Sequence, residues 1–189
     1  MHRKRLRRWE GRNDIRYVTF SCYQQLPLLK HPKIMELFVA TMVRARAKHR
    51  FELYAWVVMP EHVHVLLRPR KESTWGTVAM GWKASVARRV LSRWRKLGAP
   101  VLQRLQADNG EFHFWQPGGG FDRNVRNLAE FTKDVRYIHR NPVERGLVEA
   151  AEEWRWTSVR WWMGLRAGEV ECDPPPGDLR AWNDWKGYV

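Results

Sequence analysis

The sequence predicts an α+β protein with a ferredoxin-like, or split βαβ, antiparallel sheet, with helices on one face and a further helix after the sheet. Short runs of β-branched and aromatic residues alternate with long apolar-periodic stretches, in the order strand, helix, strand, strand, helix, strand. The link between the second and third strands is too short for a crossover, so these strands form a hairpin. At 189 residues, the chain has the size of one domain with extensions.

The first four elements precede residue 70. Residues 15–23 alternate and are rich in β-forming side chains, which predicts the first strand. Pro32 opens an amphipathic stretch that predicts a helix to about Arg50. Residues 53–58 predict the second strand, and residues 62–68 return antiparallel as the third.

The second helix is predicted from about Trp75 to Lys96. Ser73 or Thr74 can cap its start, and Gly98 follows its end. This helix carries several basic residues, which are candidate contacts for an acidic partner.

Residues 111–115 (EFHFW) predict a short fourth strand, and residues 117–120 (PGGG) predict a flexible connection. The last long helix is predicted over residues 127–141, and Pro142 should end it because proline lacks the N–H that a helix needs. We therefore divide the chain into a basic arm (1–14), a main domain (15–148) and an extension that packs on the domain or is partly flexible (149–189).

Charge points to an acidic partner. The chain has 34 Lys and Arg against 20 Asp and Glu, a net charge of +14, and the simplest partner is a phosphate backbone. A membrane surface is the rival partner, but no run of 18 or more apolar residues could span one. The basic start lacks the apolar stretch of a secretory signal, and the two cysteines match no metal-binding spacing. We therefore expect a reduced, cytoplasmic protein without a membrane partner.

The candidate nucleic-acid contacts are basic side chains of the arm and of the two later helices. An ordinary solvated arm and helix face are the alternative interpretation. Trp side chains, of which the chain has twelve, could add faces for base stacking. The candidate contacts are Arg3, Lys4, Arg5, Arg7, Arg8, Lys83, Arg88, Arg89, Arg93 and Arg140.

Two histidines, His62 and His64, are the most informative residues. Residues two apart on a strand project from the same face, so both imidazoles point one way while Val63 and Val65 point the other. Two neutral imidazoles on a stiff strand can hold a divalent cation. The alternative is a pair of histidines on a half-exposed strand face.

A tyrosine and an asparagine on the last long helix could complete such a site. Tyr137 and Asn141 are four residues apart and share one helix face. If that face covers the histidines, the Asn141 amide could be a third ligand, and two imidazoles with an amide suit Mg²⁺ or Mn²⁺. Tyr137 would then be a candidate nucleophile, since a cation favours the phenolate of a phenol that ordinarily titrates near pH 10. The alternative for Tyr137 is an ordinary tyrosine at a helix interface.

These motifs resemble the REP-associated tyrosine transposases, which are part of the HUH superfamily of single-strand DNA nucleases. The joint order and spacing of the motifs carry the resemblance, which covers roughly residues 15–162. The matching segments are residues 17–24 (YVTFSCYQ), 56–64 (WVVMPEHVH), 114–116 (FWQ), 137–148 (YIHRNPVERGLV) and 154–158 (WRWTS).

The resemblance implies a ferredoxin-like fold and a metal-dependent DNA strand transferase. It implies that His62, His64 and Asn141 hold the metal, and that Tyr137 attacks a phosphodiester, is linked to the 5′ phosphate and leaves a free 3′ hydroxyl. The implied substrate is single-stranded DNA whose imperfect palindromes fold into hairpins beside a short guide sequence. It also implies one active site per monomer, while a dimer that exchanges the tyrosine helix is the alternative.

One segment departs from the family pattern. Where relatives usually continue with basic and aromatic residues after residues 114–116, this chain has residues 117–121 (PGGGF). Because this loop precedes the tyrosine helix, we expect Tyr137 to be more mobile or to depend on DNA for its position. Two other functions remain open: a hairpin-binding protein that no longer cuts, and a metal hydrolase that uses water instead of tyrosine.

Overall fold

The computed structural model describes residues 14–70, 75–118, 120–165 and 170–176. The arm and its five candidate contacts, Arg3 to Arg8, lie outside the described residues, as do the proposed caps Ser73 and Thr74. The elements are β1 (Arg16–Ser21), η1 (Tyr23–Gln25), α1 (Pro32–His49), β2 (Glu52–Val58), β3 (His62–Arg68), α2 (Trp75–Leu97), α3 (Leu102–Leu105), β4 (Phe121–Asn124), α4 (Leu128–Glu144), η2 (Ala151–Glu153) and α5 (Val159–Trp162).

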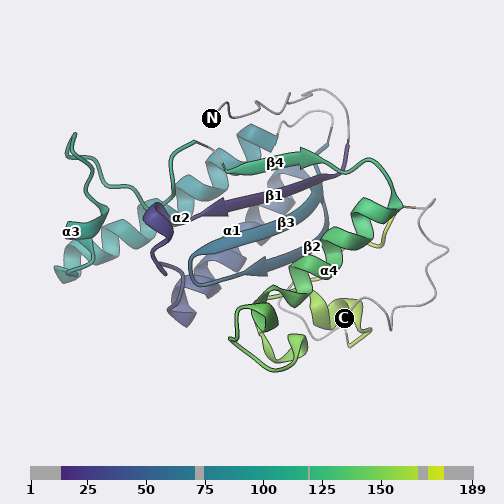
Figure 1. Ribbon diagram of the computed structural model, residues 1–189. Coiled ribbons are helices and arrows are strands. Elements are labelled where there is room, and N and C mark those ends of the chain that lie inside the picture. Colours follow the sequence, from purple (N-terminus) through teal and green to yellow (C-terminus); the bar gives the residue numbers. More distant parts are fainter. Residues whose placement is uncertain (1–13, 71–74, 119, 166–169, 177–189) are drawn as a thin grey trace, which may run out of the picture.

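The four strands form one antiparallel sheet in the order β2-β3-β1-β4 (Figure 1). This is the strand order of the ferredoxin-like fold, with β1 and β3 at the centre, so the predicted fold class is confirmed. In the β1–β3 register, Thr19 lies opposite His64 and Ser21 lies opposite His62.

Helices cover both faces of the sheet (Figure 1). Helices α1 and α2 lie on one face, and α4 crosses the other face over β2 and β3. The alternation of strand side chains divides the apolar residues between two cores. The core under α1 and α2 includes Val18, Phe20, Trp56, Val63, Val65, Phe38 and Trp82. The core under α4 includes Tyr54, Val57, Leu66, Phe131, Val135 and Ile138.

The predicted fourth strand is wrong. Residues 111–115 make only isolated bridges, and Phe114 and Trp115 instead pack into the core under α1 and α2. The fourth strand is β4, whose sequence FDRN has little β propensity. Tertiary contacts place it beside β1, including an ion pair of 2.6 Å between the buried Arg16 and Asp122 side chains.

Pro142 does not end the last long helix. Helix α4 continues to Glu144, because the turn after Pro142 still closes although proline has no N–H to donate. The Arg145 N–H donates to the Asn141 carbonyl at 3.0 Å, and the Leu147 N–H donates to the Pro142 carbonyl at 2.9 Å.

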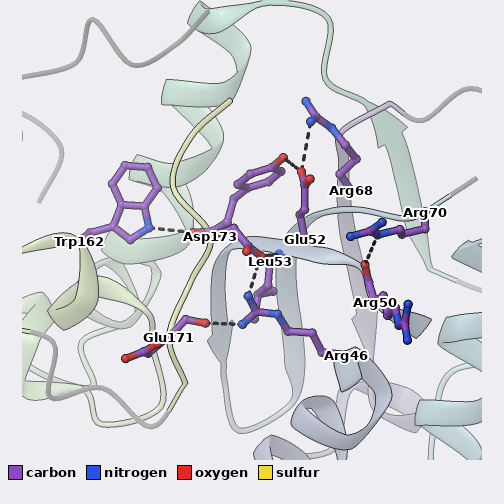
Figure 2. A network of polar contacts seen from close by, with 10 residues as sticks. Arg46, Arg50, Glu52, Leu53, Arg68, Arg70, Trp162, Glu171 and Asp173 are labelled. Atoms are coloured by element: carbon purple, nitrogen blue, oxygen red, sulfur yellow. Dashed lines mark hydrogen bonds and ion pairs between the residues drawn. The ribbon is translucent and has the colours of Figure 1, made fainter. Parts of the chain in front are cut away.

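Segments after α4 cover the outer edge of β2. The Val58 N–H donates to the Trp156 carbonyl and the Ser158 N–H to the Trp56 carbonyl, both at 2.9 Å. Further along, the Asp173 N–H donates to the Leu53 carbonyl at 2.7 Å, and the Leu53 N–H donates to the Asp173 carboxylate at 2.6 Å (Figure 2). An edge strand that would otherwise offer unpaired backbone groups is therefore paired along much of its length.

No helix in the described part of the chain is long and apolar enough to cross a membrane.

Candidate functional site

His62 and His64 lie on β3 and project from the face of the sheet that α4 covers. Their ring centroids are 4.7 Å apart, and both residues are buried. The opposite-facing Val63 and Val65 belong to the core under α1 and α2. The shared face predicted for the two imidazoles is therefore present in the structure.

Hydrogen bonds orient both imidazoles through Nδ1. His62 Nδ1 donates to the Glu61 carboxylate at 3.0 Å. His64 Nδ1 lies 2.7 Å from the Thr19 hydroxyl oxygen and 2.8 Å from the Tyr17 hydroxyl oxygen. With an oxygen at each Nδ1, Nε2 is the nitrogen of both rings that can act as a ligand, which is the usual arrangement of metal-binding histidines.

Burial favours the neutral form of both imidazoles. It lowers the pKa of His64 to about 3, and it also lowers the pKa of His62 from its ordinary value. The neighbouring Glu61 carboxylate opposes this effect at His62, but burial is the larger cause. Neutral imidazole is the form that binds a metal ion.

Helix α4 brings Tyr137 and Asn141 to the histidines. The Asn127 side chain caps the helix start, and the buried helix face packs on β2 and β3. The Tyr137 ring centroid is 5.2 Å from that of His64, and the residue is 44% exposed. Asn141 is buried, with Nδ2 at 3.4 Å from His64 Nε2.

The donor set fits a hard divalent cation with open positions. The Asn141 Oδ1 atom is buried and has no hydrogen-bond partner among the described residues, although a buried carbonyl oxygen normally has one. A cation held by this oxygen and the two Nε2 atoms would give the oxygen the partner that it lacks among the described residues. No group of three or more His, Cys, Asp or Glu side chains in the described ranges could hold a metal ion, so water and phosphate would have to complete the coordination.

Arg123 on β4 ties the tyrosine helix to the sheet. Its guanidinium forms ion pairs with Asp134 and Glu130 of α4 and lies 5.2 Å from the centre of the Tyr17 ring. Burial raises the pKa of Asp134 to about 6, while Arg123 opposes this shift. Strand β4, which pairs with β1, thus lies in the chain between the loop of residues 117–120 and α4. Through Arg123 it anchors the helix that carries Tyr137.

The predicted nucleic-acid contacts lie in several places. Arg88, Arg89 and Arg93 are exposed on α2, in the layer opposite α4. Arg140 is exposed on α4, 3.6 Å from Glu144. Lys83 differs from the other candidates on α2, because its ammonium lies over the rings of Phe20 and Trp115 at 5.3 and 5.9 Å and burial lowers its pKa.

Four residues around the histidines were not predicted from the sequence. Tyr17 and Thr19 are two residues apart on the first strand, so the sequence predicts that they share one face. Only the register between β1 and β3 shows that this face brings them to His64. Glu61 adjoins His62 and also lies 3.6 Å from the Arg145 guanidinium. Arg145 follows α4 directly, so it brings a positive charge to the edge of the site.

In the structure, a ferredoxin-like sheet carries a histidine pair under a helix that bears a tyrosine. Comparisons with known proteins find this chain similar to REP-associated tyrosine transposases. No family model matches the chain. Its sequence is 26% identical over 114 residues to the REP-associated tyrosine transposase of Escherichia coli (strain K12), a match that covers 60% of this chain. The same match spans 57% of that relative's length.

The fold is similar to that of a REP-associated tyrosine transposase whose structure was solved bound to a REP hairpin. The TM-score is 0.63 at 19% sequence identity, over 94% of this chain and 93% of that chain. The expected resemblance to the REP-associated tyrosine transposases is therefore confirmed in sequence and in fold.

Proposed function

We propose that this protein is a metal-dependent single-strand DNA endonuclease and strand transferase that acts on hairpin-forming palindromic repeats through a 5′-phosphotyrosine intermediate. One observation carries the proposal. Tyr137, which is 44% exposed, lies beside two buried imidazoles whose neutral form burial favours, and near an asparagine oxygen that has no hydrogen-bond partner among the described residues. Neither a tyrosine at an ordinary helix interface nor a hydrolase that uses water would need this grouping.

Tyr137 would supply the nucleophile. Its hydroxyl loses its proton to water, the oxygen attacks the scissile phosphorus, an O–P bond forms, and the bond from phosphorus to the 3′ oxygen breaks. The leaving oxygen takes up a proton and becomes a free 3′ hydroxyl, while the 5′ phosphate stays on the tyrosine. Because the phosphodiester energy is kept in this linkage, a second 3′ hydroxyl can reverse the step without ATP.

His62, His64 and Asn141 would hold Mg²⁺ or Mn²⁺, and a cation bound there would neutralise charge on the phosphoryl oxygen. Glu61, Thr19 and Tyr17 would keep the Nε2 atoms turned inward through the Nδ1 contacts.

DNA as the substrate is supported by the net charge of +14 and by the hairpin bound to the structural relative. Action as a monomer is supported by the site itself, because one chain supplies Tyr137, both histidines and Asn141 at contact distance. We therefore propose one active site per monomer.

The test is a denaturing gel after incubation with Mn²⁺ and a labelled DNA hairpin that carries a single-stranded flank. The wild-type protein should form a covalent adduct, and Tyr137→Phe should form none while still binding the DNA. Tyr23→Phe is the matched control, because it removes a hydroxyl from a tyrosine that contacts His113 rather than the site. An adduct in Tyr137→Phe would refute the mechanism. Tight hairpin binding by the wild type without an adduct would instead favour the hairpin-binding protein that does not cut.

A further inference from the structure

Arg145 is a charged residue at the edge of the histidine site that takes no part in the proposed steps. It is the first residue after α4, and its N–H donates to the Asn141 carbonyl at 3.0 Å. In the same turn, the Gly146 N–H donates to the Val143 carbonyl at 2.9 Å. The backbone of Arg145 is therefore fixed to the turn of α4 that carries Asn141.

The side chain of Arg145 is held more loosely than its backbone. The guanidinium lies 3.6 Å from the Glu61 carboxylate, which is longer than a hydrogen bond, and the side chain is 58% exposed. An ion pair this exposed contributes little to stability. The same Glu61 oxygen accepts a hydrogen bond from His62 Nδ1 at 3.0 Å, so it keeps a partner when the guanidinium moves away. Arg145 can therefore exchange Glu61 for another anion at little cost.

The positive charge of Arg145 acts on both histidines. Burial is the largest cause of their lowered pKa values, and the charge of Arg145 lowers the pKa of His62 and of His64 further. The two imidazoles in the form that burial favours and the Asn141 amide are uncharged donors, so they would not neutralise a divalent cation. Such a cation and the guanidinium would repel each other. An anion that contacts both is therefore favoured at this edge of the site.

We propose that Arg145 is a catalytic residue, which leaves Glu61 when DNA binds and donates hydrogen bonds to a non-bridging oxygen of the scissile phosphate. A guanidinium presents its N–H groups in a planar fork that matches phosphate oxygens. During phosphoryl transfer, negative charge is spread over these oxygens, and a donor that meets this charge accelerates the reaction. The inference rests on the proposed function, because it assumes that Tyr137 attacks a phosphodiester.

A purely structural role of Arg145 is the alternative. The contact with Glu61 would then hold the end of α4 against the turn before His62. Removing Arg145 would loosen Asn141 and Glu61 together, so metal binding and cleavage would both become weaker. A catalytic Arg145 instead repels the cation until phosphate is present, so its removal should strengthen metal binding while it slows cleavage. The two roles therefore differ in the sign of the effect on metal binding.

The test replaces Arg145 with glutamine, which keeps a polar side chain but carries no charge. Lys133→Gln is the matched control, because Lys133 is an exposed cation of the same helix, about two turns before Asn141. Mn²⁺ binding is measured by calorimetry without DNA. Adduct formation is measured at saturating Mn²⁺ and a saturating concentration of a DNA hairpin with a single-stranded flank. Binding of the same DNA is measured by fluorescence anisotropy in EDTA.

Arg145→Gln should slow adduct formation roughly a hundredfold, which is typical of losing one donor to the transition state. Binding of the DNA should weaken by no more than about threefold, because phosphate contacts elsewhere also hold it. Without DNA, the variant should bind Mn²⁺ roughly fivefold more tightly, because a positive charge near the cation is gone. Arg145→Lys should recover part of the rate, since lysine keeps the charge but not the planar fork. Lys133→Gln should equal the wild type in all three measurements.

An unchanged rate of adduct formation in Arg145→Gln would overturn the inference. A slower rate together with weaker Mn²⁺ binding would also overturn it, because that combination indicates the structural role. Failure of the proposed function gives a different result. If the wild-type protein forms no adduct, the tyrosine mechanism is refuted and the inference with it. A normal adduct in the wild type and in Arg145→Gln refutes the inference alone.

Discussion

Gly120 directly precedes β4, and its backbone lies very close to β1. Its φ is +83°, and a Cβ atom at this position would lie 2.1 Å from the Thr19 carbonyl oxygen. The Thr19 side chain in turn contacts His64 Nδ1 at 2.7 Å. Replacing Gly120 with alanine therefore tests how the entry to the fourth strand and the candidate site are linked.

Two costs add up in Gly120→Ala. A non-glycine residue with positive φ costs about 1–2 kcal/mol, and the clash with a backbone atom must be relieved by moving β4 away from β1, which we place at about 1–3 kcal/mol. Gly118→Ala is the matched control from the same loop, because its φ is +99° but no atom lies within 4 Å of the added Cβ. Gly118→Ala should therefore lose only the free energy that a positive φ costs a non-glycine residue.

Urea or thermal unfolding measures the difference directly. Gly120→Ala should lose about 2–5 kcal/mol of unfolding free energy, and Gly118→Ala about 1–2 kcal/mol. At a temperature where both variants are folded, adduct formation should be slower in Gly120→Ala, because movement of Thr19 disturbs the orientation of His64. Equal stability and equal rates in the two variants would refute the reasoning.

The remaining predictions concern the metal ligands, the edge of the sheet, pH and the form of the DNA. His62→Ala combined with His64→Ala should abolish cleavage and Mn²⁺ binding measured by calorimetry, with the circular dichroism spectrum retained; residual cleavage in Mg²⁺ would contradict the ligand assignment. Asp173→Ala should cost about 1–2 kcal/mol in urea unfolding, because the buried Leu53 N–H loses its acceptor and Arg46 loses an ion pair of 2.7 Å; an unchanged midpoint would count against the edge contact. Below pH 6.5 the unfolded chain protonates His64 while the folded chain, with a pKa of about 3, does not, so stability must fall as pH falls. The metal-free protein should lose about 2 kcal/mol between pH 6.5 and 5, and His64→Asn should remove this part of the slope. A flanked hairpin should be cut and a perfect duplex of the same sequence should not, since unstacking a duplex costs roughly a few kcal/mol per step; comparable rates would indicate a double-strand nuclease.

Local patterns predicted the parts of the molecule in which neighbouring residues decide the structure. The alternation around His62 and His64 predicted their shared face, and the four-residue spacing of Tyr137 and Asn141 predicted theirs. The short turn at residues 59–61 predicted the antiparallel hairpin of β2 and β3.

Long-range pairing was the part that local patterns could not predict. Residues 111–115 have the aromatic, alternating pattern of a strand, but their side chains fill a core instead. Strand β4 is polar, and it exists because β1 and the ion pair between Arg16 and Asp122 hold it. The contacts of Tyr17 and Thr19 with His64 depend on the register between β1 and β3, which the sequence does not state.

The pairing of β2 with the segments after α4 makes the fold depend on contacts between distant parts of the chain. Leu53 and Asp173 are 120 positions apart, so this edge of the sheet can close only when nearly all of the described chain is available. Contacts of such separation slow folding and leave intermediates with an open strand edge. A chain shortened before Trp156 would keep Tyr137, Asn141 and both histidines, yet β2 would be free to pair with β2 of another copy. Such a shortened protein would then aggregate during folding. A loss of activity in it would therefore not test the chemistry of the site.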